Sequence, residues 1–189
     1  MMHALWQKKL ELHYSKDVLD IIQFGSSTLE GKQPRDIDIA VLFQKIPIKT
    51  QLEQAQMIKQ QLQKNSEISV HITSLDLYSL FNEANFARES ILLNGISLLS
   101  GFPFAARFGL LPRIHIHYSL VRLQKKDKIR FHYMLQGKKG RYGLLRQYHG
   151  KLLQPGLIEI QPQHEHLFLE AIRLYNVSIK VEKIFLASS

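Results

Sequence analysis

The order of hydrophobic and polar residues predicts helices alternating with short strands in the first half of the chain. Residues 6–19 carry apolar side chains at helical spacing, residues 20–24 form a short apolar run that Gly25 stops, and residues 36–43 form a second strand. Further along, the same criteria predict a helix over 49–65, a strand over 68–73, helices over 75–86 and 87–94 (the second ended by Gly95), and an apolar run over 96–99. This order predicts an α/β or α+β domain built on a small mixed sheet.

The second half shows a different pattern, in which cations and glycines interrupt the apolar positions. A basic helix is expected over 118–135 and ends at Gly137. A glycine-and-cation loop over 137–143, a helical turn over 144–149, a turn over 154–156, a strand over 157–160 and a helix over 163–176 follow. These elements predict a small basic module that is helical, winged-helix-like or α+β.

Charge divides the chain at the same place. The net charge is +9, but residues 1–104 hold 10 Lys+Arg against 11 Asp+Glu, whereas residues 105–189 hold 15 against 5. Together with Phe102-Pro103, this shift predicts two domains, 1–104 and 105–189. It favours a polyanionic partner for the second domain; the alternative is a solvated basic surface without a partner.

Composition excludes several classes of protein. The chain has no cysteine, so disulfides, thiolate zinc sites and a cysteine nucleophile are ruled out. No run of about 18 apolar residues is present, and the first twelve residues mix Lys8, Lys9 and Glu11 among their hydrophobics, unlike a signal peptide. We therefore expect a cytoplasmic protein with no membrane partner.

One motif predicts a ligand-binding or catalytic site: Gly25-Ser26 at the end of a predicted strand, a loop, and then Asp36-Ile37-Asp38 at the start of the next strand. Glycine permits a sharp turn close to a ligand, and Ser26 with the following amides can donate hydrogen bonds to phosphate oxygens. Two aspartates at i and i+2 on a strand project from the same face, where their carboxylates can hold Mg²⁺ against a triphosphate.

This spacing resembles the signature of the nucleotidyltransferase superfamily of the DNA polymerase beta type, and in size the chain is most similar to the minimal nucleotidyltransferases of prokaryotes. The resemblance covers residues 18–101, including the closing segment 90–101. It implies transfer of NMP from an NTP such as ATP to a hydroxyl or phosphate. Gly25 and Ser26 would bind the nucleotide phosphates, and Asp36 and Asp38 would bind Mg²⁺, with Mn²⁺ as a substitute.

The chain departs from that family at the third carboxylate, which active members usually carry on a later strand. His71 occupies the expected position in 68–73. Three interpretations follow: His71 is a functional substitute in catalysis, Asp76 swings in, or the site binds nucleotide without turnover. Helix capping is the simpler role for Asp76, which begins an apolar helical stretch.

Cations and aromatic residues gather in the second domain, where they predict a surface for RNA or DNA. The residues that we expect to bind nucleic acid are Lys138, Lys139, Arg141 and Arg146. The glycines at 137, 140 and 143 match neither a dinucleotide fingerprint nor a Walker A loop. The paired histidines at 115/117 and 164/166 lack the spacing of a zinc site and are interpreted as surface residues.

Two functions are consistent with these residues. The first is a metal-dependent nucleotidyltransferase whose acceptor is a nucleic acid, a protein hydroxyl or a small molecule. The second is a catalytically impaired nucleotide- or nucleic-acid-binding module, including the antitoxin role in which the domain pairs with a helical toxin protein.

Overall fold

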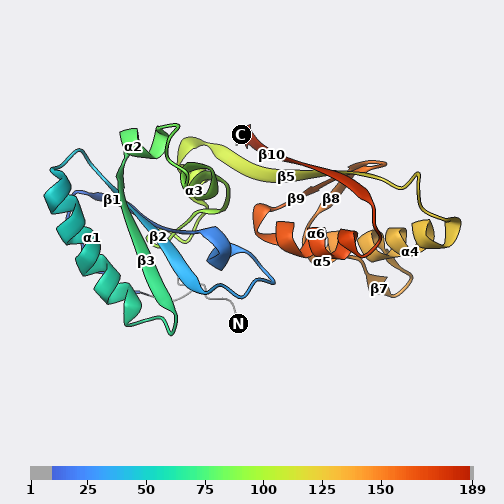
Figure 1. Cartoon of the computed structure of the whole chain (residues 1–189), viewed down its shortest axis with the longest axis horizontal. Helices are drawn as coiled ribbons and strands as arrows, with labels where there is room; N and C mark the ends of the chain where they lie inside the picture. The colour runs from blue at the N-terminus through green and yellow to red at the C-terminus, as the bar shows by residue number, and fades with distance from the viewer. Residues whose placement is uncertain (1–9, 188–189) are drawn as a thin grey trace. The chain divides into compact units, whose positions relative to one another are not determined.

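The computed structural model describes residues 10–187, which fold into two compact units of mixed helix and strand (Figure 1). One unit comprises the described residues up to Thr28 together with Lys32–Gly109, and the other comprises Leu29–Gly31 and the described residues from Leu110 onward. Each unit has its own four-stranded sheet, so the predicted α+β class is confirmed. The boundary predicted at residue 104 falls inside the 3-10 helix η3 (Phe104–Phe108), whose Phe104 is fully buried in the first unit.

The first unit contains a mixed sheet in the order β3-β2-β1-β4. Its strands are β1 (Val18–Phe24), β2 (Asp36–Phe43), β3 (Ser69–Asp76) and β4 (Ile96–Ser97). Strand β1 pairs antiparallel with both β2 and β4, whereas β2 and β3 are parallel. A parallel pair needs a crossover connection, which the helix α1 (Ile48–Gln63) provides.

Both faces of this sheet are covered, which explains why β1 and β2 are apolar along most of their length. On one face, Ala55, Ile58 and Leu62 of α1 pack against the sheet. On the other face, buried residues of α2 (Leu77–Phe81), α3 (Arg88–Asn94) and η3 form a second cluster with the strands. The sheet is therefore held rigidly between two layers.

Two helices predicted in the first half differ from the structure. The helix expected over 6–19 is wrong for the described residues: residues 10–15 have no regular structure, and β1 already includes 18 and 19. Residues 6–9 of that prediction lie outside the described residues. The helix expected over 75–86 is limited to α2, because Asn82 and Asn85 accept hydrogen bonds from the amides two residues on and form turns. Helix α3 ends at Gly95, as predicted.

The second unit is an antiparallel sheet in the order β10-β5-β9-β8, with its helices on one side (Figure 1). The strands are β5 (Leu110–Ser119), β8 (Lys151–Gln154), β9 (Leu157–Ile160) and β10 (Ser178–Ala187). The helices are α4 (Lys125–Gln136), α5 (Leu144–Gln147) and α6 (Glu165–Arg173), preceded by the 3-10 helix η4 (Pro162–His164). Each helix contributes buried apolar residues to the core, as do β5 and β9.

Of the three alternatives predicted for the second half, the α+β module describes what is observed. Helix α4 starts at Lys125 rather than at 118, because 110–119 belong to β5. It ends at Gly137, as expected, and the loop predicted over 137–143 contains a small hairpin of β6 (Gly137–Lys138) and β7 (Arg141–Tyr142). The long strand β10 was not predicted from the sequence.

Candidate functional site

The turn after β1 lies directly beside the start of β2. Phe24 pairs with Asp38 in the antiparallel register, so Gly25 begins the turn next to the Asp38 side chain. Gly25 has a positive φ of 74°, and a Cβ built on it would be 2.6 Å from Oδ2 of Asp38. Both observations require glycine at this position, because an L side chain would be strained and would displace the carboxylate. The pairing of β1 and β2 thus brings the two halves of the sequence motif together.

Residues 25–28 form a 3-10 turn, η2 (Gly25–Thr28), whose hydroxyl groups differ in exposure. Ser27 and Thr28 are buried and donate back to the carbonyl oxygens of Phe24 and Gly25, at 3.1 and 2.8 Å. Ser26 is only partly buried, and within the described residues its hydroxyl has no partner. Ser27 and Thr28 stabilise the turn, and Ser26 is left available for a ligand.

Strand alternation places the two aspartates of β2 on one face. Ile37 and Ile39 are at most 1% exposed in the core beneath α1, while Asp36 and Asp38 are partly exposed on the opposite face, as predicted. The pKa of Asp38 is raised above its usual value, first by burial and then by the negative charge of Asp36; His71 partly offsets the shift. The site therefore holds two carboxylates that repel each other.

His71 lies beside this pair. In the parallel register of β2 and β3 it is the partner of Asp38, and its Nδ1 is 3.7 Å from Oδ2 of Asp36. The His71 side chain is 59% exposed and the Asp36 side chain 35% exposed, so the group is open to solvent. The position expected from alternation along the strand is thus observed, while the catalytic role of His71 stays a prediction.

The interpretation that Asp76 swings into the site is wrong. Asp76 pairs with Phe43 at the opposite end of β2 and β3 from Asp36. Its Oδ1 accepts a hydrogen bond from the Ser79 backbone N–H at 2.6 Å, which makes it the N-cap of α2 and lowers its pKa. Asp76 therefore caps a helix, the simpler of the two roles considered for it.

A buried carboxylate that sequence reasoning missed, Asp20, lies on β1, the antiparallel neighbour of β2. Asp20 is fully buried, accepts hydrogen bonds from the Ser97 hydroxyl and the Ile21 N–H, and pairs with Arg107 at 2.6 Å. Burial nevertheless raises its pKa. Asp20 pairs with Leu42, toward the far end of β2, and is outside the candidate site. Its signal in the sequence was a single acid at the head of an apolar run.

The four cations predicted to bind nucleic acid gather around the β6–β7 hairpin of the second unit. Lys138, Lys139, Arg141 and Arg146 all line one groove of about 740 Å³, together with Tyr133 and Tyr142. The interpretation of the paired histidines as surface residues is wrong for His164. His164 is only 7% exposed and its Nδ1 lies 2.8 Å from a carboxylate oxygen of Glu30, within the same unit.

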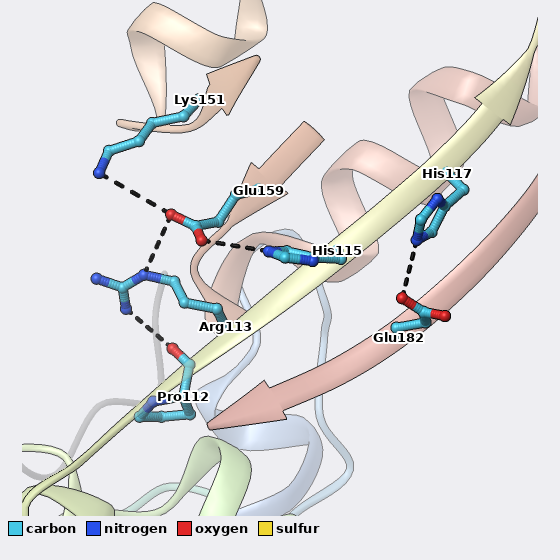
Figure 2. Close-up of polar contacts among 7 residues, drawn as sticks. All are labelled: Pro112, Arg113, His115, His117, Lys151, Glu159 and Glu182. Carbon is cyan, nitrogen blue, oxygen red and sulfur yellow. Dashed lines mark hydrogen bonds and ion pairs between the residues drawn. The ribbon is translucent and has the colours of Figure 1, made fainter. Parts of the chain in front are cut away.

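The face of the second sheet opposite the helices carries a compensated carboxylate (Figure 2). Glu159 on β9 is 8% exposed, and three cationic or titratable groups surround it: Arg113, His115 and Lys151, at 3.8, 3.3 and 4.0 Å. A separate pair joins Nε2 of His117 to Glu182 at 2.8 Å. Both histidines thus form hydrogen bonds with carboxylates on the sheet.

Asp36 and Asp38 lack such compensation. Within the described residues neither carboxylate forms an ion pair with a Lys or Arg, and the His71 imidazole is the basic side chain that lies beside Asp36. Across residues 10–187, no group of three or more His, Asp or Glu side chains is arranged to hold a metal ion by itself. Any metal at Asp36 and Asp38 would thus need further ligands from a substrate or from water.

Two further observations concern membrane-spanning helices and similarity to known proteins. None of the helices in the described part of the protein has both the length and the apolar character that a membrane crossing requires. Compared with protein-family models, with curated proteins and with solved structures, the chain matches none of them.

Proposed function

We propose that the first unit is a metal-dependent nucleotidyltransferase, which transfers NMP from an NTP to an acceptor hydroxyl on a nucleic acid or a protein. The observation that carries this proposal is the uncompensated pair Asp36 and Asp38, held on one strand face beside the Gly25 turn. The resemblance of this motif to the nucleotidyltransferase superfamily supports the same function.

The carboxylate pair favours a cation as its partner. Two like charges on adjacent positions of one strand face are destabilising unless something neutralises them. The raised pKa of Asp38 reflects burial first and then the negative charge of Asp36. Carboxylate oxygens are the ligands that Mg²⁺ and Mn²⁺ prefer. Asp36 and Asp38 would hold the metal, which when bound neutralises charge on a triphosphate, and the phosphate oxygens would complete its ligands.

The turn after β1 is suited to the phosphates. With no side chain on Gly25, the Asp38 carboxylate lies directly against the turn, and the Ser26 hydroxyl has no partner among the described residues. Hydroxyl and amide donors at such a turn bind phosphate oxygens. Gly25 and Ser26 would thus orient the nucleotide against the carboxylate pair.

His71 is the residue that we assign to the acceptor side. A neutral imidazole can take a proton from an attacking hydroxyl, and the exposed side chain of His71 lies next to Asp36. It brings one negative charge fewer than the carboxylate usual at this position, which weakens the site for Mg²⁺.

That substitution favours a second candidate function, a nucleotide- or nucleic-acid-binding module without turnover. The specific observation is that Asp36, Asp38 and His71 do not form a complete three-ligand metal group. An antitoxin that pairs with a helical toxin protein is one form of this candidate.

Incubation with each α-³²P-labelled NTP separates the two candidates. Mg²⁺ or Mn²⁺, total RNA and cell lysate are supplied, and the double variant Asp36→Asn/Asp38→Asn is compared with wild type. The matched control is Glu53→Gln/Glu67→Gln, which removes two exposed acids from the same unit. Label on a macromolecule with wild type and control, but not with Asp36→Asn/Asp38→Asn, supports transfer. Sensitivity of the labelled product to nuclease or protease identifies the acceptor. Metal-dependent NTP binding without label under any condition would overturn transfer in favour of the binding module.

A further inference from the structure

The β6–β7 hairpin directly follows α4, and its exposed strands and turn carry cationic side chains. Gly137 has a φ of 89°, and its N–H donates to the Tyr133 carbonyl, so the helix turns directly into the hairpin. A Cβ on Gly143 would overlap the Gly137 backbone nitrogen, which shows how closely the two ends of the hairpin approach. These contacts constrain the backbone at both ends of the hairpin, while the cationic side chains between the two glycines are exposed to solvent.

The groove beside the hairpin carries one sign of charge. Four of the residues that line its roughly 740 Å³ are Lys138, Lys139, Arg141 and Arg146, and among the described residues lining it none is acidic. Such a volume lies within the range of about 300–1,000 Å³ typical of ligand sites. The groove has room for several phosphates or nucleotide units.

Two tyrosines of the groove are exposed and are paired with cations. The Arg146 guanidinium carbon lies 4.1 Å from the centroid of the Tyr142 ring, and Lys138 Nζ lies 5.5 Å from that of Tyr133. Tyr142 is 69% exposed and Tyr133 42% exposed, so neither ring belongs to the core. Exposed rings held by cations are stacking platforms for nucleic-acid bases.

A second hollow of about 530 Å³ adjoins the first and shares both tyrosines with it. Its lining adds the apolar and aromatic side chains of Met134, Leu144, Ala171 and Tyr175, together with Arg130 and Gln147, and it shares Lys138 and Arg141 with the first hollow. The hairpin therefore stands between a cationic hollow, suited to phosphates, and a more apolar hollow, suited to the faces of bases.

We propose that the β6–β7 hairpin and its two hollows bind single-stranded nucleic acid. Lys138, Lys139 and Arg141 contact the phosphates, while unstacked bases lie on Tyr142 and Tyr133. A duplex keeps its bases stacked internally and presents only phosphates, so it cannot use the rings. This inference rests on the proposed function in one respect: it names single-stranded nucleic acid as the acceptor of the proposed transfer. Binding at the hairpin does not itself involve Asp36 or Asp38.

Fluorescence anisotropy with a labelled single-stranded oligonucleotide of mixed sequence tests this site in the full chain. RNA and DNA strands are measured separately, each beside the duplex of the same sequence, over a series of salt concentrations. Lys138→Gln/Arg141→Gln is expected to weaken binding and to reduce the salt slope by about 1.4, at roughly 0.7 per lost phosphate contact. The matched control Lys125→Gln/Lys126→Gln removes two exposed lysines from the start of α4 and should leave the slope close to wild type.

Tyr142→Ala tests the stacking contact separately from charge. It should weaken single-strand binding by about five- to a hundredfold at unchanged salt slope, whereas Tyr142→Phe keeps the ring and should bind like wild type. Tyr78→Ala removes an 83% exposed tyrosine from the first unit and is the control. Melting curves for each variant check that the fold is retained.

Several results would overturn the proposal. Tighter binding of duplex than of single strands, equal competition by inorganic polyphosphate, or binding only to anionic lipid vesicles would each assign the groove to another polyanion. Unchanged affinity in Tyr142→Ala and Lys138→Gln/Arg141→Gln would place the binding elsewhere. Asp36→Asn/Asp38→Asn should bind single strands like wild type. A negative result in the transferase assay would therefore not change the interpretation of the binding measurements.

Discussion

Two sites of this protein, one in each unit, hold their carboxylates in opposite ways. In the second unit, Glu159 is almost completely buried and is surrounded by Arg113, His115 and Lys151 (Figure 2). In the first, Asp36 and Asp38 share one strand face with a single histidine beside them. A compensated carboxylate stabilises the fold, whereas an uncompensated pair is retained at a cost to stability and points to a cation that binds from solution.

Removing one acid of the pair is expected to have the largest effect on activity. Asp38→Asn should reduce nucleotidyl transfer by at least about a hundredfold, because metal neutralisation of the triphosphate contributes several kcal/mol to catalysis. Its melting temperature should stay the same or rise, since a repulsion is relieved. Transfer assays and thermal melts on the same preparation check both parts, and full activity with a lowered melting temperature would make the pair a structural feature.

Glu159→Gln should lower the stability of the protein, whereas Asp38→Asn should lower its activity and not its stability. It leaves the three surrounding groups without their carboxylate and should lower the free energy of unfolding by about 2 kcal/mol, measured by urea denaturation. Glu182→Gln is the control, because Glu182 pairs with His117 and Lys180 at a solvent-exposed position, so its loss should lower the free energy of unfolding less than the loss of Glu159. Equal effects of the two substitutions would remove the distinction between the buried and the exposed carboxylate.

Asp20 offers an intermediate case, a buried acid with a single cation. Arg107→Gln should destabilise the protein by about 1.5 kcal/mol at neutral pH, since the Arg107 side chain is 48% exposed and solvent screens part of the interaction. The pKa of Asp20 is raised in the folded state, so its contribution to stability is fully present below the unfolded pKa and is lost as pH rises through the folded pKa. The difference between variant and wild type should therefore shrink toward acid pH, which urea denaturation over a pH series would reveal.

A third carboxylate in the candidate site would sharpen the comparison. His71→Asp places an acid beside Asp38 in the parallel register and should tighten Mg²⁺ binding by about tenfold, because affinity rises with the number of charged oxygen ligands. Titration calorimetry of the protein without nucleotide measures this, with His71→Asn as the uncharged control. Identical affinities in the two variants would show that position 71 does not reach the metal.

The sequence predicted the region around the carboxylate pair more accurately than the rest of the molecule. Residues 36–43 form the strand expected of them, because alternation of acid and isoleucine followed by continuous apolar residues is typical of a strand buried on one face and then on both. The position of His71 followed from the same alternation. By contrast, Leu10 and Leu12 pack against the core from a segment without helix, and their apolar character alone did not reveal this.

Long-range pairing accounts for most of what could not be predicted. Strand β10 mixes Lys180, Glu182 and Lys183 with apolar residues, and only its pairing with β5 over its whole length makes it a strand. Asp20 could not be recognised as an ion-pair partner, because Arg107 and Ser97 reach it from distant positions in the chain. For the groove, the sequence indicated both the cations and the interleaved aromatic residues, but not which cation lies over which tyrosine ring.

The pairing of β10 with β5 also has a consequence for biosynthesis. Leu110, the first residue of β5, is the register partner of Ala187, the last residue of β10, so nearly the whole second unit must be translated before its outer strand can form. Until then, one edge of β5 is open to other nascent chains. Arrest peptides placed at increasing distances after β10 should therefore detect folding force from the second unit only once the residues of β10 have left the ribosome tunnel.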